Sequence, residues 1–163
     1  YITGLNLTIS LFQEMAEQEK VIGIKCSSES TFELQQFKDL GGKDFLVFNG
    51  PDEQFVAGRA IGADGGIGGT YGVMPELFMA LDKYMNEGEG KKARELQNEV
   101  NKIIKILLSV GSLYGATKYI MSLRGVETGS PRLPLLPITD ESTKEMLKRT
   151  NEKILELVEK VKI

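Results

Sequence analysis

Residues 21–25 read Val21-Ile22-Gly23-Ile24-Lys25, a run of small and apolar residues that ends in a lysine. Short apolar runs between polar segments are typical of strands buried in a parallel sheet that is covered on both faces. A lysine at the end of such a strand lies where barrel enzymes place their catalytic groups. The sequence therefore predicts a buried strand that presents Lys25 at the edge of a sheet. The alternative is a strand-end lysine whose side chain simply extends into solvent.

Two further strand-like segments follow, over residues 44–49 and 63–69, and each has a distinctive end. The first runs into Asn49-Gly50-Pro51-Asp52-Glu53, and the second is rich in glycine. Helical patterns separate the strands and follow the last one, over residues 31–40, 53–61 and 75–85. This alternation predicts βα units around a parallel sheet, and hence an α/β fold.

The carboxyl ends of parallel strands meet on one face of a sheet, so the residues that follow the three strands are expected to gather there. They are Lys25, Ser27, Gly50, Asp52, Glu53, Gly68, Gly69 and Thr70. An amine, two carboxylates and a glycine-lined backbone suit a polar, oxygen-rich small molecule. The glycines lack the spacing and the following helix of a dinucleotide-binding loop, which argues against a nucleotide cofactor.

Three segments carry a more specific resemblance. They are Gly23-Ile24-Lys25-Cys26-Ser27-Ser28, Phe48-Asn49-Gly50-Pro51-Asp52-Glu53 and Gly62-Ala63-Asp64-Gly65-Gly66-Ile67-Gly68-Gly69-Thr70-Tyr71. In order and spacing they resemble the last three strands of the N-acetylneuraminate lyase and dihydrodipicolinate synthase family. The resemblance implies about strands six to eight of a TIM (β/α)8 barrel over residues 1–88, with strands near 21–25, 44–49 and 63–69. Residues 89–163 are then a C-terminal helical extension.

The resemblance also implies a reaction. Lys25 matches the family's lysine that forms a Schiff base with pyruvate, and Ser27 would orient the substrate beside it. Aldol cleavage needs an electron sink, which an iminium on Lys25 supplies without a cofactor or a metal. The 163 residues contain no histidine, the side chain on which zinc sites of metal-dependent aldolases depend.

Further residues are expected to bind the rest of the substrate. Gly50, Asp52 and Glu53 match residues that hold the polyhydroxy tail of a sugar acid, and Gly68 and Gly69 would contact its middle. Gly69 departs from the pattern, because several lyases of the family carry a serine there.

The acidic loop after the second strand resembles the lyases more than the synthases. The implied activity is that of a class I aldolase, the reversible cleavage of N-acetylneuraminate to N-acetylmannosamine and pyruvate. Two alternatives remain open. One is dihydrodipicolinate synthesis or cleavage of another 2-keto sugar acid within the same family, and the other is a non-catalytic binding protein derived from a barrel.

A complete barrel of this kind needs about 250 residues, whereas the chain has 163. The opening residues Tyr1-Ile2-Thr3-Gly4-Leu5-Asn6-Leu7 resemble the segment after the family's fifth strand. The family's catalytic tyrosine and its pyruvate-carboxylate loop are therefore expected in a missing N-terminal half. The expected partners are this half, pyruvate or a 2-keto sugar acid, and further copies in a homotetramer.

The composition narrows the class of protein. Twenty basic and 23 acidic residues give a formal net charge of −3 and are interspersed, so no basic face predicts nucleic-acid binding. No run approaches the roughly 18 apolar residues of a membrane span, and no signal-peptide pattern opens the chain. A single cysteine is compatible with a reducing compartment, and a cytoplasmic protein is expected.

Two neighbours of the predicted site invite a structural interpretation. Cys26 follows Lys25 in the strand and is therefore expected on the opposite face, packed under a helix. Asp64 is either catalytic or a carboxylate that bonds a turn or strand. Beyond the barrel strands, helices are predicted over residues 91–110, 113–123 and 140–162, with an extended, proline-rich connector over 129–137.

Overall fold

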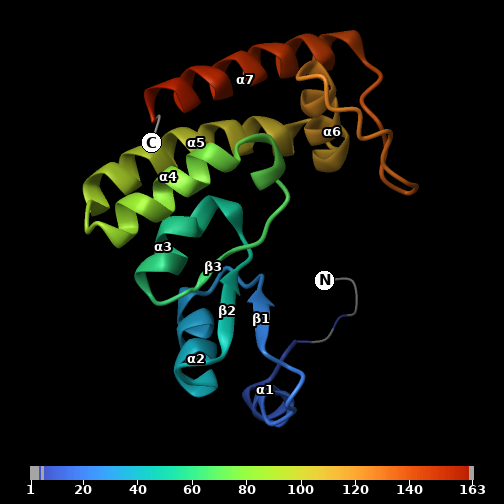
Figure 1. The fold of residues 1–163 in the computed structure, drawn as a ribbon. Helices are drawn as coiled ribbons and strands as arrows, with labels where there is room; N and C mark the ends of the chain where they lie inside the picture. Colours follow the sequence, from blue (N-terminus) through green and yellow to red (C-terminus); the bar gives the residue numbers. More distant parts are fainter. Residues whose placement is uncertain (1–3, 5, 162–163) are drawn as a thin grey trace. The chain divides into compact units, whose positions relative to one another are not determined.

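The computed structural model describes residues 4 and 6–161 of the 163 (Figure 1). Of the opening segment that resembles the region after the family's fifth strand, residues 1–3 and 5 lie outside the described residues. The chain divides into two compact units, Tyr1–Ile67 and Gly68–Ile163. The expected boundary at residue 88, between barrel and helical extension, is a different division and stays a prediction.

The first unit contains the sheet. Its elements are α1 (Ile9–Ala16), β1 (Gly23–Cys26), α2 (Thr31–Gly41), β2 (Leu46–Asn49), the 3₁₀ turn η1 (Asp52–Gln54), α3 (Phe55–Ala60) and β3 (Gly65–Gly66). The three strands are parallel in the order β1-β2-β3. All three predicted strands are present, which confirms the α/β class. β3 is shorter than predicted, although Asp64 N–H and Ile67 N–H extend its pairing to the carbonyls of Val47 and Asn49.

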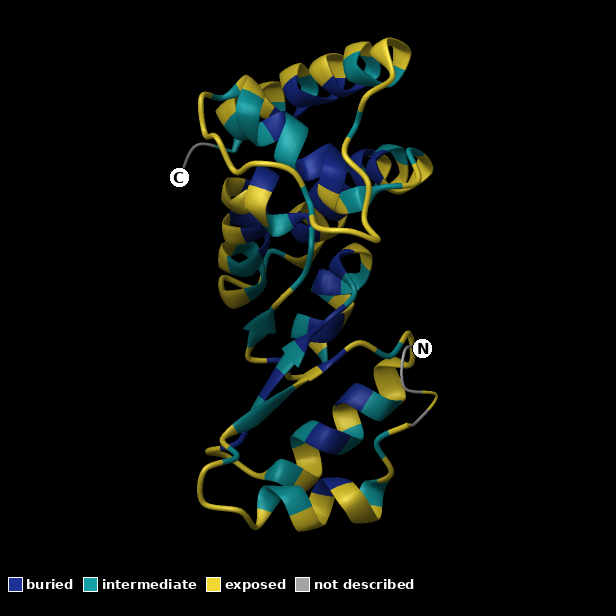
Figure 2. Ribbon diagram, turned by 90° about the vertical axis from the view of Figure 1, so that its right-hand side faces the viewer, coloured by how far each residue is buried: buried dark blue, intermediate teal, exposed yellow. Residues whose placement is uncertain are grey.

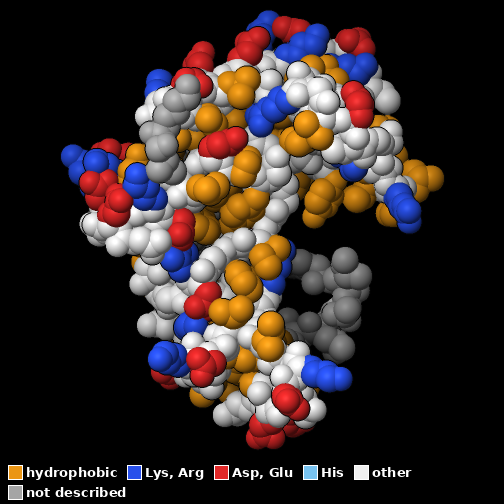
Figure 3. Space-filling view, viewed as in Figure 1, with side chains coloured by type: hydrophobic (Ala, Val, Ile, Leu, Met, Phe, Trp, Pro, Cys, Tyr) orange, Lys and Arg blue, Asp and Glu red, His pale blue; other side chains and the backbone are white. Residues whose placement is uncertain are grey.

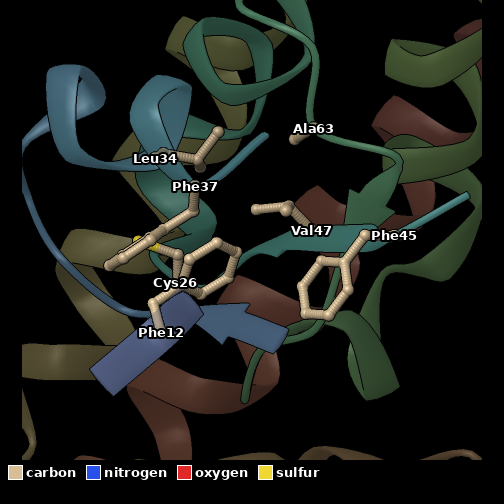
Figure 4. Packing of buried hydrophobic residues seen from close by; sticks show 7 residues of the cluster. All are labelled: Phe12, Cys26, Leu34, Phe37, Phe45, Val47 and Ala63. Carbon is tan, nitrogen blue, oxygen red and sulfur yellow. The ribbon is translucent and has the colours of Figure 1, made fainter. Parts of the chain in front are cut away.

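The core of the first unit lies beside this sheet (Figure 4). It consists of Phe12, Cys26, Leu34, Phe37, Phe45, Val47 and Ala63. The ring of Phe12 lies 4.9 Å from that of Phe37 and meets the edge of Phe45 at 5.3 Å, both centroid distances. Aromatic pairs in these arrangements are more stable than their buried area alone accounts for.

The sequence did not lead us to expect α1, which brings Phe12 into this core. Its local signal is Thr8, whose hydroxyl accepts a hydrogen bond from Leu11 N–H at the start of the helix. Cys26 lies under α2, where it contacts the cluster that contains Leu34 and Phe37, as predicted. Burial raises the pKa of its thiol, so the group is a neutral core side chain.

Asp64 holds three parts of the first unit together. Its carboxylate accepts hydrogen bonds from Val47 N–H at 2.8 Å and from Lys38 Nζ at 2.8 and 2.9 Å. Lys38 Nζ also donates to the carbonyl of Phe45 at 3.0 Å. Since Lys38 belongs to α2 and Val47 to β2, the carboxylate joins a helix, the central strand and the start of β3. These contacts support the structural interpretation of Asp64 over the catalytic one.

The second unit is helical. After the 3₁₀ turn η2 (Tyr71–Val73) it contains α4 (Pro75–Asn86), α5 (Gly90–Ser109), α6 (Leu113–Leu123) and α7 (Glu141–Lys160). The apolar side of α5 is buried, with Val100, Ile103 and Leu107 fully enclosed, and Figure 2 shows exposed residues along the outer side of α7. Asp140 caps α7, and its side chain accepts a hydrogen bond from Thr143 N–H at 2.8 Å. Within the described residues no single helix is long and apolar enough to cross a membrane, and α5 and α6 reach that criterion only when joined across a bend of 112°.

The contacts of Asp64 predict a stability that depends on pH. Partial desolvation acts to raise the pKa of Asp64, but the hydrogen bonds from Lys38 and Val47 outweigh it and hold the pKa below its ordinary value. A lowered pKa in the folded state stabilises the fold above the unfolded value of about 3.9, and this contribution disappears as the pH falls through the folded value. We expect Asp64→Asn to lower the free energy of unfolding at pH 7 by about 1 kcal/mol and to flatten the acid limb of the stability curve, as measured by urea unfolding.

Glu95→Gln is the matched control. Glu95 pairs with Lys91 at 3.9 Å on the surface of α5, where both side chains are exposed. Such a pair contributes roughly 0–0.5 kcal/mol. Equal losses in the two variants would show that the Asp64 contacts are no more than a surface ion pair.

Candidate active site at the carboxyl ends of the strands

Lys25 lies near the carboxyl end of β1, in register with Phe48 of β2. Side chains alternate along a strand, so Cys26 points into the core while Lys25 does not. Cys26 is buried and Lys25 is exposed among the residues described. The described part of the chain therefore leaves the side chain of Lys25 exposed.

Gly50 brings the ends of β1 and β2 unusually close together. Its N–H donates to the carbonyl of Cys26 at 2.7 Å. A Cβ atom at this position would lie 2.6 Å from Ser27 Oγ and 2.6 Å from the Cys26 carbonyl oxygen, which is too close for any side chain. Only glycine lets the loop after β2 pass beside Ser27, and the predicted contact of Gly50 with the substrate stays a prediction.

The two predicted carboxylates differ in exposure. Asp52 is 6% exposed, whereas the next residue, Glu53, is exposed. Both belong to η1, the tight turn that follows Gly50 and Pro51. The amide of Asn49 donates to the carbonyl of Pro51 at 2.7 Å and so helps to form this turn.

A hollow of about 770 Å³ opens at this end of the first unit and brings several predicted residues together. It is lined by Gly4, Asn6, Leu7, Ile24, Lys25, Cys26, Ser27, Ser28, Glu29, Ser30, Glu33, Phe37, Pro51 and Glu53. Lys25, Ser27 and Glu53 therefore share one cavity, with an amine, a hydroxyl and a carboxylate on its wall. Asp52 does not line it.

Gly68 and Gly69 belong to the second unit, and their predicted roles in substrate binding stay predictions. A Cβ atom on Gly69 would lie 3.1 Å from Cδ2 of Leu113 and 3.6 Å from Cε1 of Tyr114. A serine at this position, as several lyases have, would require Leu113 to move. The space around Gly69 thus suits a glycine better than the serine that several lyases of the family carry there.

Sequence reasoning missed two polar side chains that shape the site. Asn49 is 1% exposed and bonded to Pro51, and Gln54 Nε2 donates to the carbonyl of Ser28 at 3.1 Å. The position of Asn49 as the last residue of β2, at the end of an apolar run, is a signal that could have identified it. No pattern in the sequence pointed to Gln54.

The described residues contain no group of three or more His, Cys, Asp and Glu side chains placed to hold a metal ion. Basic and acidic side chains are interspersed on the face shown in the space-filling view (Figure 3).

The fold and this constellation of residues match a known family. A family model described as the dihydrodipicolinate synthetase family matches residues 1–153. The chain belongs to this family, and the resemblance inferred from the three strand-end motifs is confirmed.

Curated relatives are similar over nearly the whole chain. An N-acetylneuraminate lyase of Mediterraneibacter gnavus is 42% identical over 161 residues, which cover 98% of this chain and 51% of that protein. An N-acetylneuraminate lyase of Enterobacter sp. (strain 638) is 31% identical over 89% of this chain and 48% of its own length. The chain therefore spans about half the length of these relatives.

Solved structures are also similar to nearly the whole of this chain, and the chain covers about half of each of them. The wild-type sialic acid aldolase of Ruminococcus gnavus matches with a TM-score of 0.91 and 42% identity over 97% of this chain and 53% of its own. A second structure of that enzyme is a catalytic lysine mutant. An N-acetylneuraminate lyase of Fusobacterium nucleatum, complexed with pyruvate, matches with a TM-score of 0.86 and 31% identity over 95% of this chain and 52% of its own. The predicted fold class, part of a TIM-barrel aldolase followed by helices, is confirmed.

The close approach at Gly50 leads to a prediction about stability. Gly50→Ala places a methyl group against backbone and Ser27, so strands or loop must shift, and we expect a loss of about 1–3 kcal/mol in urea unfolding. Gly72→Ala is the control, because a Cβ atom there meets nothing within 4 Å. A Gly50→Ala protein as stable as the Gly72→Ala protein would contradict the described packing of the loop.

Proposed function

We propose that this chain is the C-terminal half of a class I aldolase that reversibly cleaves N-acetylneuraminate to N-acetylmannosamine and pyruvate. The observation that carries the proposal is that Lys25 shares one hollow with Ser27 and Glu53 at the carboxyl ends of parallel strands. The similarity to lyases at 42% and 31% identity supports the choice of substrate.

The proposed chemistry starts at Nζ of Lys25. The neutral amine attacks the C2 carbonyl of the open-chain sugar acid, and loss of water gives an iminium. The bond between C3 and C4 then breaks as the C4 hydroxyl loses its proton, and its electron pair moves into the iminium to form an enamine. N-acetylmannosamine leaves as an aldehyde. Protonation of the enamine at C3 and hydrolysis release pyruvate and regenerate the amine.

The remaining residues bind the substrate in this proposal. Ser27 orients the carbonyl carbon beside Lys25. Glu53, which lines the hollow, accepts hydrogen bonds from the hydroxylated tail, and charge-assisted hydrogen bonds of this kind are stronger than neutral ones. Asp52 does not line the hollow, and the same role is assigned to it by its match to the family's motif alone. The backbone at Gly50 borders the tail, as its position beside Ser27 supports.

Gly68 and Gly69 are assigned contacts with the middle of the substrate, by their match to the family's motif. The tyrosine that moves the proton of the C4 hydroxyl, and the loop that holds the pyruvate carboxylate, are assigned to an N-terminal half of the barrel. We further propose a homotetramer in the cytoplasm as the working form. Dihydrodipicolinate synthesis, cleavage of another 2-keto sugar acid and non-catalytic binding are the alternatives that the following experiments separate.

The first experiment traps the iminium. Treatment of the complete barrel with pyruvate and borohydride should add one reduced pyruvyl group, which peptide mapping should locate on Lys25. Lys25→Arg should abolish the label, because a guanidinium stays protonated near neutral pH. Lys43→Arg, an exposed lysine of the same unit, should label like the parent. Labelling of another lysine, or none, would falsify the Schiff-base assignment and leave the binding protein as the alternative.

The second experiment concerns the tail of the substrate. Asp52→Asn and Glu53→Gln keep the approximate shape but remove a charged acceptor, so each should weaken transition-state binding of N-acetylneuraminate by roughly 1.5–3 kcal/mol. Pyruvate labelling of Lys25 should persist, since pyruvate has no tail. The measurement is kcat/KM for cleavage, with Asp39→Asn on the exposed side of α2 as the control. Parent-like cleavage by both variants would restrict the two carboxylates to a structural role.

A further inference from the structure

We propose that Gln54 is a positioning residue that sets selectivity for substrates with a long polar tail. It would do so by fastening the loop after β2 to the loop after β1. The inference rests on the proposed function, because it concerns how Glu53 and Asp52 are held relative to Lys25.

The contact that carries the inference joins residues far apart in the sequence. Gln54 closes η1, and its Nε2 donates to the carbonyl of Ser28 at 3.1 Å. Ser28 lies three residues after Lys25 and lines the same hollow. The side chain of Gln54 is partly buried and does not line the hollow itself. It therefore acts on the site only through the residues that it connects.

The loop that carries the two carboxylates is held at both ends. At its start, Gly50 N–H donates to the carbonyl of Cys26 at 2.7 Å. At its end, Gln54 donates to Ser28, the second residue after Cys26. Asp52 and Glu53 lie between these two attachments. The backbone of both loops and the two hydrogen bonds between them form a closed ring, and this ring limits how far the two carboxylates can move from Lys25. Loss of the second bond removes the interloop attachment at this end, where the buried Phe55 of α3 then remains as the anchor, while β1 and β2 remain paired.

An amide is the side chain that this position needs. The acceptor is a backbone carbonyl, so Gln54 must donate. Glutamate at the same position would set a carboxylate against the carbonyl oxygen and add a third negative charge beside Asp52 and Glu53. Methionine would keep a similar length and remove the donor without adding charge. The two substitutions thus separate loss of the hydrogen bond from the effect of charge.

The test compares two substrates in the complete barrel. One is N-acetylneuraminate, and the other is a short 4-hydroxy-2-keto acid that lacks the polyhydroxy tail but is cleaved through the same iminium. For Gln54→Met we expect kcat/KM for N-acetylneuraminate to fall about three- to tenfold, the equivalent of one net hydrogen bond, mainly through KM. Gln54→Glu should lose at least as much. Cleavage of the short substrate and pyruvate labelling of Lys25 should stay within about twofold of the parent.

The control is Gln35→Glu, the same change of charge at an exposed position of α2, which should leave the ratio of the two kcat/KM values unchanged. A purely structural role of Gln54 predicts that both substrates lose activity together and that the melting temperature falls, and this result overturns the inference. So does an unchanged ratio in both Gln54 variants while the parent labels at Lys25. A parent that neither labels nor cleaves overturns the proposed function, and the inference with it.

Discussion

Parallel pairing of β1 with β2, closed at its carboxyl end by Gly50, is the constraint on which the candidate site depends. The N–H of Gly50 reaches the carbonyl of Cys26 at 2.7 Å, and no room remains for a side chain. Because the strands are parallel, the residues after each of them emerge on the same side of the sheet. Ser27 and the carboxylate-bearing turn after β2 therefore become neighbours, although they are far apart in the chain. A bulkier residue at Gly50 would separate the loops that the site needs side by side.

Side chains alternate along β1, so that Cys26 points into the core and Lys25 points to the other face. Cys26 enters a core built by α1 and α2, where burial raises the pKa of its thiol and keeps it neutral. Lys25 points away from that core and reaches the hollow. The aromatic cluster around Phe12 packs against one face of the strand. This packing sets the position of Lys25, and the side chain of Lys25 is not part of it. The amine that we propose for covalent chemistry is thus positioned by the backbone of a packed strand.

Three carboxylates of the first unit differ in their contacts and in their exposure. Asp64 bonds to Lys38 and to Val47 N–H and serves to connect α2 with the central strand. Asp52 is buried in the turn after β2, whereas Glu53 faces the hollow. The two neighbouring carboxylates of η1 thus differ in what each can contact in the folded chain.

Much of this protein was determined by the sequence alone. Apolar runs predicted three strands, the 3.6-residue period predicted the helices, and the motifs around Lys25, Asp52 and Glu53 identified the family, because local pattern and residue type suffice for each of these. The helix that carries Phe12 was not foreseen, since its burial depends on a distant aromatic cluster. Only the tertiary structure decided that Asp64 is a structural tie, that Asp52 and Glu53 differ in exposure, and that Gln54 joins two loops. Each of these depends on a contact between residues at least 17 positions apart or on burial in the folded chain, and no local pattern in the sequence records such contacts.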